Sequence, residues 1–370
     1  MAELAMKDLR VTYGDFYAPS FQIKIKGKNI CKDINAAISG VRVSLGCGFE
    51  ANSCSFTVDN LYDIKNRKFR GELSTYFTLG TVVEVYMGYL ETTLVFMGLI
   101  SSLSFSYGSD GAPSVGVECL DIKSRMMSDK MSEARTEKKY SEVAKSILKK
   151  HLDSKAIKNI SVEDFEQTAM PIIEKPSISD YEFLCSIARE IGYEFFVQGD
   201  TVYFQKSLKD KAALINLEFG MDLMSFRTSR RLPGQVYSVI VRYTGENSSD
   251  LIEFEAKADK IGGGKKMTGA EEGKIPKGVT KVIVNPKIKN EKDAKAAAES
   301  MLKELCMDYI SCSGTCVGFP EFVPGRMITV SKLGLNDKNV NEFYVVRVEH
   351  SIDSSGYGVS FEGKMDTTEL

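Results

Sequence analysis

The stretch from Asn290 to Phe361 constrains the fold of this chain more than any other part of the sequence. It opens with an Ala-rich segment of helical spacing and continues with strand-like runs separated by turns rich in Gly, Pro and Asn. This order predicts the closing half of a small antiparallel barrel with one helix laid across it. No pattern in the stretch is typical of catalysis, so the sequence favours a structural component over an enzyme.

Residues 8 to about 125 carry the pattern of many short strands. Segment 21–26 alternates apolar and polar side chains, as a half-buried strand does. Segments 41–45 and 54–58 do the same, and two further runs flank a turn at residues 89–93. Short strands at this spacing are typical of a sandwich or barrel. The chain is therefore expected to begin, as well as end, with a strand-rich domain.

The middle of the chain has a different pattern. Ser179 and Glu182 form a capping box ahead of a segment with one apolar helical face. Gly192 supplies a left-handed stop for that helix, and a hairpin with its turn at Gly199 follows at once. These signals predict a small α/β module that spans residues 131–208.

Together the patterns predict a mainly β chain with an α+β insertion. The expected boundaries place a first strand-rich domain at 1–130, the α/β domain at 131–208 and a second strand-rich domain at 209–370. Residues 257–277 are charged and Gly-rich, and they lack the spacing of a phosphate-binding loop. They are expected to form a mobile Gly/Lys-rich surface loop.

Five residues are assigned structural roles at turns. Glycine adopts a positive φ at little cost, and proline pre-sets φ for a turn. The five are Gly192 at a helix stop, Gly199 in a hairpin turn, Pro324 and Gly325 before the strand at 327–330, and Gly356 in the last turn.

Composition argues against several classes of function. The formal net charge of −2 provides no basic field for nucleic acid, and no run approaches the ~20 apolar residues of a membrane helix. The eight cysteines include no CxxC pair and are accompanied by only two histidines, so neither a metal site nor a cofactor is predicted. The N-terminus does not have the pattern of an export signal, so free thiols are expected.

Neither histidine is predicted to be catalytic. His151 falls at the end of a predicted helix, where the dipole favours a cation, and it is expected to be solvated. His350 falls at the end of a predicted strand and is expected to be a hydrogen-bonded structural residue. The acidic residues stand in no recognisable catalytic context, so no catalytic residue is assigned.

Four stretches mix glycine with β-forming residues in a fixed order: 80–103, 179–204, 217–226 and 320–357. On these stretches the chain resembles the late control protein D family, the baseplate hub proteins of contractile phage tails. These are related in architecture to the hub part of type VI secretion spike proteins. The resemblance implies two tube-type β-barrel domains separated by the small α/β domain.

The resemblance also implies an assembly. A homotrimer with two barrels in each chain would make a ring of six, which stacks on a sixfold tail tube protein and holds a threefold central spike protein. Baseplate wedge proteins are the further expected partners, in a phage tail or tail-like particle assembled in the bacterial cytoplasm. Neither membrane insertion nor sequence-specific nucleic-acid binding is expected. Because the chain ends at Leu370, any spike or wall-degrading enzyme is expected to be a separate polypeptide.

Two alternatives remain open at this point. One is a tail-associated carbohydrate-binding module, which the absence of Trp disfavours. The other is a peptidoglycan hydrolase that uses paired carboxylates. Under the hub hypothesis, some Phe, Tyr and Met side chains of the strands should be exposed in the monomer and buried in the trimer, and the inner wall of the ring should be polar.

Overall fold

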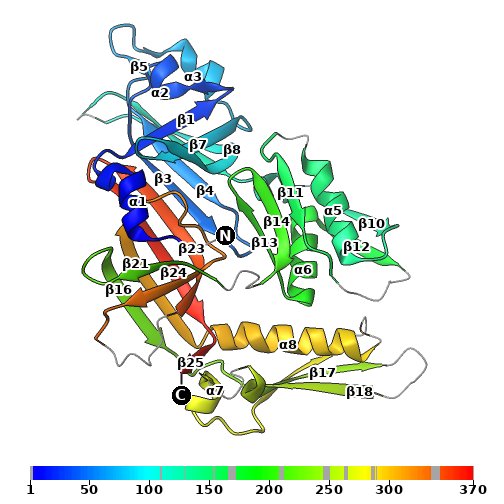
Figure 1. The fold of residues 1–370 in the computed structure, drawn as a ribbon. Coiled ribbons are helices and arrows are strands. Elements are labelled where there is room, and N and C mark those ends of the chain that lie inside the picture. Colours follow the sequence, from blue (N-terminus) through cyan, green and yellow to red (C-terminus); the bar gives the residue numbers. More distant parts are fainter. Residues whose placement is uncertain are drawn as a thin grey trace.

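The computed structural model describes residues 3–108, 111–128, 130–152, 155–165, 172–207, 212–244, 251–261, 266–284, 288, 290–334 and 342–369. Strands dominate these residues, and the helices flank the main sheet (Figure 1). The mainly β fold with an α-containing insertion that the sequence predicts is confirmed. Within these ranges, no helix is both long and apolar enough to cross a membrane.

One large sheet contains thirteen of the strands in the described residues and joins the two ends of the chain (Figure 1). Its strands pair in the order β16-β21-β24-β23-β3-β4-β9-β8-β7-β1-β2, and β22 pairs with both β15 and β23. The N-terminal strands are β1 (Ser20–Ile25), β2 (Lys28–Asn29), β3 (Ile38–Gly46), β4 (Ser53–Val58), β7 (Val82–Gly88), β8 (Thr92–Ser106) and β9 (Ser114–Leu120). The C-terminal strands are β15 (Ala213–Glu218), β16 (Leu223–Arg230), β21 (Ile310–Val317), β22 (Met327–Ser331), β23 (Glu342–Asp353) and β24 (Gly356–Met365).

Alternation of side chains explains why these segments are strands. In β3, Val41, Val43 and Leu45 are buried, whereas Arg42 and Ser44 point to the opposite face. The other central strands follow the same period of two, so one face of the sheet covers an apolar core and the other is polar.

A seam between β3 and β23 unites the two strand-rich regions, and the two strands lie side by side in Figure 1. They pair antiparallel, with Val43 opposite His350 and Leu45 opposite Val348. A single hydrophobic core extends from one region to the other across this seam. No local sequence pattern signals such a contact, because its two strands are about 300 residues apart.

Short elements cover the ends of the N-terminal half. They are α1 (Met6–Thr12), η1 (Gly14–Phe16), α2 (Ile30–Asp33), α3 (Gly71–Tyr76) and the β5 (Tyr62–Asp63) and β6 (Lys68–Phe69) hairpin. The segment before α1 reaches the C-terminal half, since Leu4 N donates a 2.7 Å hydrogen bond to Leu214 O.

The middle module forms its own lobe beside the main sheet (Figure 1). Its elements are α4 (Lys123–Met126), β10 (Lys130–Arg135), α5 (Tyr140–His151), β11 (Asn159–Val162), β12 (Ile173–Ser179), α6 (Asp180–Ile191), β13 (Tyr193–Gln198) and β14 (Thr201–Lys206). Strands β11, β14 and β13 form a small sheet, and α5 and α6 supply much of the core. The capping box before α6 and the hairpin after it are present as predicted.

A second small α/β unit branches from the C-terminal half. It contains β17 (Ser238–Thr244), β18 (Leu251–Lys257), η3 (Ala258–Lys260), β19 (Lys266–Thr268), α7 (Gly269–Glu272), β20 (Thr280–Val284) and α8 (Glu291–Met307), and β25 (Thr367–Glu369) pairs with its β19. The sequence predicts β17 as part of the second barrel. Instead β17 lies in a separate three-stranded sheet, because its apolar side chains Val239 and Val241 pack with Ala298 and Leu302 of α8.

The mobile loop predicted near 257–277 is wrong for part of that stretch. Residues 262–265 lie outside the described residues, but 266–272 form β19 and α7. Thr268 and Glu271 make a capping box, and β19 pairs with β25. These bonds satisfy the backbone groups that a solvated loop leaves to water.

Close packing in the C-terminal half makes Gly318 sensitive to substitution. A Cβ atom at Gly318 would lie 2.1 Å from the ring of the buried Tyr357. Gly318→Ala is therefore expected to lower the free energy of unfolding by roughly 1–3 kcal/mol. Gly278→Ala, where a Cβ meets nothing within 4 Å, is the matched control. Urea denaturation of both variants measures the difference, and equal losses would contradict this packing.

Candidate functional site

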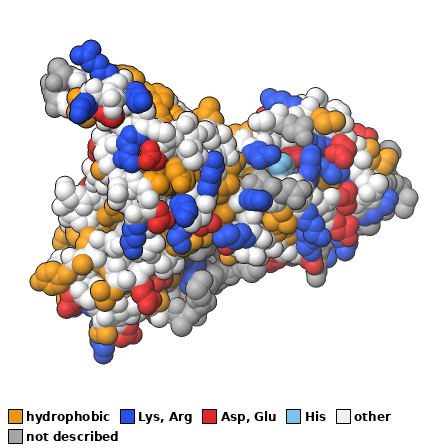
Figure 2. Space-filling model, turned by 90° about the horizontal axis from the view of Figure 1, so that it is seen from above, with side chains coloured by type: hydrophobic (Ala, Val, Ile, Leu, Met, Phe, Trp, Pro, Cys, Tyr) orange, Lys and Arg blue, Asp and Glu red, His pale blue; other side chains and the backbone are white. Residues whose placement is uncertain are grey.

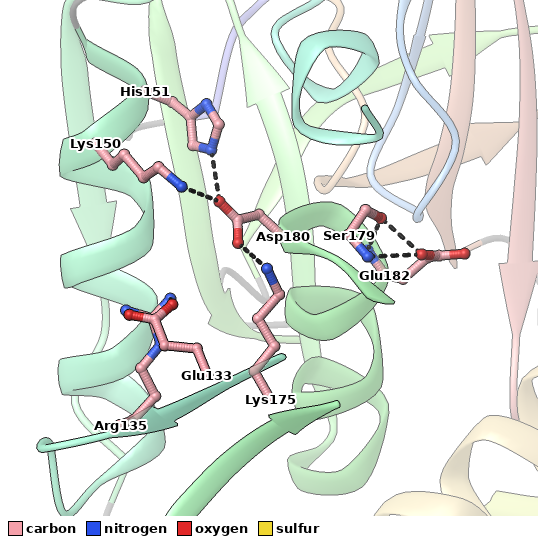
Figure 3. A network of polar contacts seen from close by, with 8 residues as sticks. All are labelled: Glu133, Arg135, Lys150, His151, Lys175, Ser179, Asp180 and Glu182. Carbon is pink, nitrogen blue, oxygen red and sulfur yellow. Dashed lines mark hydrogen bonds and ion pairs between the residues drawn. The ribbon is translucent and has the colours of Figure 1, made fainter. Parts of the chain in front are cut away.

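The most concentrated group of buried charges lies in the middle module (Figure 3). Lys175 Nζ lies 2.5 Å from Asp180 Oδ1, and both side chains are almost fully buried. His151 Nε2 lies 3.0 Å from Asp180 Oδ2, and Lys150 Nζ lies 3.5 Å from the same oxygen. Burial alone would raise the pKa of Asp180, but the hydrogen bonds from His151 and Lys175 and the nearby lysine charges lower it well below its ordinary value.

This cluster ties elements together. His151 and Lys150 come from the end of α5, Lys175 from β12 and Asp180 from the first turn of α6. The expectation that His151 is solvated is wrong: the side chain is buried, because the start of α6 places the Asp180 carboxylate against the end of α5.

The neighbouring Ser179 and Glu182 are occupied by helix capping (Figure 3). Glu182 N donates to Ser179 Oγ at 3.1 Å, while Ser179 N donates to Glu182 Oε2 at 2.8 Å. This cluster therefore has the contacts of a structural network. Among the described residues, no group of three or more His, Cys, Asp or Glu side chains is placed to hold a metal ion.

His350 lies within β23 and is completely buried. Its Nε2 lies 3.0 Å from Phe322 O, which can only accept, so this nitrogen donates and Nδ1 accepts from the Tyr357 hydroxyl at 2.8 Å. Burial lowers the pKa of His350 to about 4. The predicted hydrogen bonding of His350 is confirmed.

A second polar contact, partly buried, joins the middle module to the main sheet. Tyr344 Oη of β23 lies 2.6 Å from both carboxylate oxygens of Glu194 of β13. Burial raises the pKa of Glu194 to about 7, although the Tyr344 hydrogen bond opposes the shift. Nearby, Asn52 Nδ2 donates to Val197 O at 2.7 Å, which fixes the same boundary.

A groove of about 650 Å³ lies where α8 and β18 face β22 and β23. Lysines and glutamates line it together, and neighbouring pairs neutralise one another, as with Lys257 and Glu255 at 3.2 Å and Lys295 and Glu299 at 3.9 Å. These exposed pairs are not a convergent catalytic arrangement.

The turn residues selected from the sequence lie in three separate parts of the fold. Gly192 ends α6 with a φ of 69°, and Gly199 connects β13 to β14 with a φ of 56°. Pro324 is buried and precedes Gly325, whose φ is 81° and whose N–H donates to Val345 O at 2.8 Å. Gly356 begins β24 with a φ of 121°.

Two of these turns carry a stability prediction. Gly192→Val and Gly356→Val are each expected to lower the free energy of unfolding by ~1 kcal/mol or more, because a β-branched residue disfavours positive φ. Gly48→Val is a suitable control, since Gly48 is not in the positive-φ region and has open space at its Cβ position. Thermal melts that show no loss for the first two variants would contradict their assigned roles.

The strongest feature of the molecule is a repeat within the main sheet. The strand order β3-β4-β9-β8-β7 corresponds to β16-β21-β24-β23-β22, and each neighbouring pair is antiparallel in both halves. The pairing registers of the two halves also agree. Cys54 of β4 and Cys312 of β21 occupy equivalent positions, opposite Cys119 of β9 and Gly363 of β24 respectively. Only the next strand differs in direction, because β1 is antiparallel to β7 whereas β15 is parallel to β22.

Irregularities coincide in the two halves as well. A bulge follows Ile100 in β8, and another follows Val345 in β23. Gly80 N donates to Ile100 O at 2.8 Å, as Gly325 N donates to Val345 O, and Gly80 has a φ of 77°. Since a bulge bends its strand, β8 and β23 are bent at equivalent positions.

The aligned residues share chemistry that the sequence analysis missed. Once the registers are aligned, residues 53–57 (Ser-Cys-Ser-Phe-Thr) match 311–315 (Ser-Cys-Ser-Gly-Thr), and Arg42 matches Arg227. The repeated Ser-Cys-Ser-x-Thr is a signal by which the duplication could have been found.

The face of the sheet opposite the core is polar in both halves. Two hollows on this face are lined in part by small hydroxyl side chains, namely Ser39, Ser44, Ser55, Thr57, Ser104, Ser225, Ser313, Thr315, Ser351 and Ser360. On the face drawn in Figure 2, positive, negative and hydrophobic side chains are interspersed. That view therefore shows no continuous basic stripe of the kind that binds nucleic acid.

Comparison with solved structures identifies the class of fold. The prophage MuSo2 43 kDa tail protein from Shewanella oneidensis matches with a TM-score of 0.69 at 12% identity, over 94% of this chain and 98% of that one. The tail protein from Neisseria meningitidis MC58 matches with a TM-score of 0.69 at 13% identity, over 95% and 97%. The E. coli c3393 protein, described as a component of the type VI secretion system, matches with a TM-score of 0.57 at 10% identity, over 92% and 76%. The chain thus has the fold of phage tail proteins.

The family is shown by sequence. The family model described as the Alg8 N-terminal domain matches residues 17–354, and this chain belongs to that family. The description names a domain and no reaction. A comparison with curated proteins finds no match.

Proposed function

We propose that this chain is a baseplate hub protein of a contractile phage tail or phage-tail-like particle, of the late control protein D type. Three copies form a ring that joins a sixfold tail tube protein to a threefold central spike protein, with baseplate wedge proteins around it. The protein works as a symmetry adaptor, without a cofactor and without catalysis, in a particle assembled in the bacterial cytoplasm.

The repeat carries this proposal. The two halves share strand order, register, bulge position and a positive-φ glycine, so each chain offers two similar surfaces around one axis. Three such chains present six similar surfaces to a sixfold tube while keeping threefold symmetry elsewhere. The fold shared with the tail proteins from Shewanella and Neisseria supports the same assignment.

The exposed apolar residues support an assembly. Met221 is 67% exposed just before β16, Met224 is 70% exposed within it, and Tyr107 is 68% exposed after β8. Exposed apolar side chains at sheet edges are typical of surfaces that bind another chain. The polar face described above is suited to the inner wall of the ring, because a channel must not hold its cargo tightly.

Electron microscopy of the purified protein in negative stain tests the hub directly. Class averages are expected to show a ring with six lobes and threefold symmetry around a central channel. Compact particles without a ring, at concentrations well above micromolar, would contradict the proposal.

The hydrolase alternative makes a different prediction. The buried carboxylate of Asp180 is engaged by Lys175, and the partly buried carboxylate of Glu194 by Tyr344. The groove beside α8 is lined by paired lysines and glutamates. Zymography on bacterial peptidoglycan is therefore expected to give no clearing. A cleared zone that migrates with the protein would favour the enzyme.

A further inference from the structure

The seam between β3 and β23 has a counterpart that lacks a partner within the chain. By the repeat, β3 corresponds to β16, and the second half of β23 corresponds to the second half of β8. Among the described residues, β16 pairs along its length with β21 alone, and β8 beyond Ile100 pairs with β9 alone. Each strand therefore presents a row of backbone N–H and C=O groups to which another strand can bind.

We propose that β16 of one chain pairs with the second half of β8 of a second copy, in the antiparallel register that β3 and β23 use within the chain. This pairing rests on the hub assembly proposed above and specifies its subunit contact. Transfer of the register places Arg230 opposite Leu103, Ser229 opposite Ser104, Thr228 opposite Phe105, Arg227 opposite Ser106 and Phe226 opposite Tyr107.

Burial distinguishes the closed seam from the open one. His350 and Ile352 of β23 are 0% and 4% exposed, because β3 and its neighbours cover them. Their counterparts Phe105 and Tyr107 are 45% and 68% exposed. Phe69 of β6 lies beside Phe105, with ring centroids 5.4 Å apart, but leaves Phe105 and Tyr107 exposed. The same sheet position is thus buried in one half and exposed in the other, as expected when the missing strand belongs to another molecule.

The open seam differs from the closed seam in its side-chain pairs. In the closed seam, Arg42 Nε lies 3.4 Å from Glu349 Oε1. The counterparts are Arg227 and Ser104, which form no such pair. At the positions of Val41 and Ile352, which lie opposite one another in the closed seam, the register brings Phe226 opposite Tyr107. Aromatic cross-strand pairs stabilise antiparallel strands.

In a closed ring, the proposed contact leaves no β16 edge and no β8 edge unpaired. Each chain has one β16 and one β8, so the contact is heterologous, and a heterologous contact forms a closed ring when the rotation between copies matches the number of copies. Within the chain, the closed seam already joins the N-terminal half to the C-terminal half through β3 and β23. Repeating the same step between chains uses every remaining β16 and β8 edge once three chains have joined.

Disulfide trapping tests the register. Ser104→Cys combined with Ser229→Cys places two thiols directly opposite one another across the proposed seam, on its solvent face. Directly opposed residues lie about 4.5–5.5 Å apart between Cα atoms, which is within the range of a disulfide. After oxidation with copper phenanthroline, a non-reducing gel is expected to show linked dimers and trimers that disappear with reductant.

Two matched variants control the experiment. Ser44→Cys with Glu349→Cys occupies the equivalent pair in the closed seam and is expected to link within one chain. Ser104→Cys with Thr228→Cys places the thiols on opposite faces and is expected not to link. The eight native cysteines are free, and the unsubstituted chain shows how far they contribute.

The outcomes separate this contact from the hub itself. A trimer by native mass whose Ser104/Ser229 double variant stays unlinked, while the Ser44/Glu349 control links, overturns the proposed strand pairing and leaves the hub standing. A chain that remains monomeric overturns both. Linking of the Ser104/Thr228 pair as efficiently as the Ser104/Ser229 pair would also overturn the register.

Discussion

Replacing Asp180 with alanine is expected to lower the free energy of unfolding by about 3–5 kcal/mol. The reason is that Lys175, with a side chain only 1% exposed, loses the carboxylate 2.5 Å away that neutralises it. The loss should appear as a lower urea midpoint by circular dichroism. Lys150→Ala is the matched control, because it removes a contact with the same carboxylate from a side chain that is 55% exposed. Its cost is expected to be about 0–1 kcal/mol, and equal losses in the two variants would contradict this account.

The Asp180 effect should depend on pH in one direction. Its pKa is lowered in the folded chain, so its stabilisation is fully present above the unfolded pKa of about 3.9 and is lost as pH falls through the folded value. The difference between wild type and Asp180→Ala should therefore shrink as the pH falls below about 4. A difference that grows on acidification would contradict the assignment.

Glu194→Gln is expected to remove a pH dependence of opposite sign. The pKa of Glu194 is raised to about 7, whereas an unfolded glutamate has a pKa of about 4.3. Between these values the unfolded chain releases a proton that the folded chain keeps, so wild-type stability should fall as pH rises from about 4.5 to 7, by on the order of 3 kcal/mol.

The variant isolates the contribution of Glu194. Glutamine keeps the size of the side chain beside Tyr344 but cannot ionise. The free energy of unfolding of the variant should therefore rise relative to that of wild type as pH rises from about 4.5 to 7. Glu342→Gln, at an exposed carboxylate paired with Lys266 at 3.0 Å, should leave the wild-type profile unchanged in shape. Denaturation midpoints at several pH values measure this. A Glu194→Gln profile parallel to wild type would show that the carboxylate ionises in the fold as it does in water.

Local signals in the sequence were sufficient for the middle module. Ser179, Glu182 and Gly192 define α6 through contacts between residues near one another in the chain, and each of these contacts is present. His151 was misjudged for the complementary reason. Its partner Asp180 belongs to another helix, and only the packing of α5 against α6 brings the two together.

The seam could not be predicted, because it depends on long-range pairing. Periodicity marks β3 and β23 as strands but does not say that Val43 lies opposite His350. In the same way, the second strand-rich domain predicted at 209–370 includes the residues of β17, but this strand lies in a separate sheet because it packs against the apolar face of α8. The candidate assembly surface depends on such pairings. The short Ser-Cys-Ser-x-Thr match is the local sequence signal of the repeat that defines this surface.

The mass of the purified protein under native conditions tests the central claim most directly. If two repeated half-sheets let three chains build a ring of six, the main species should have three times the chain mass of 41.0 kDa. A monomer or a dimer as the only species, at all concentrations up to about 100 μM, would contradict the account, because obligate interfaces of this kind persist far below that concentration.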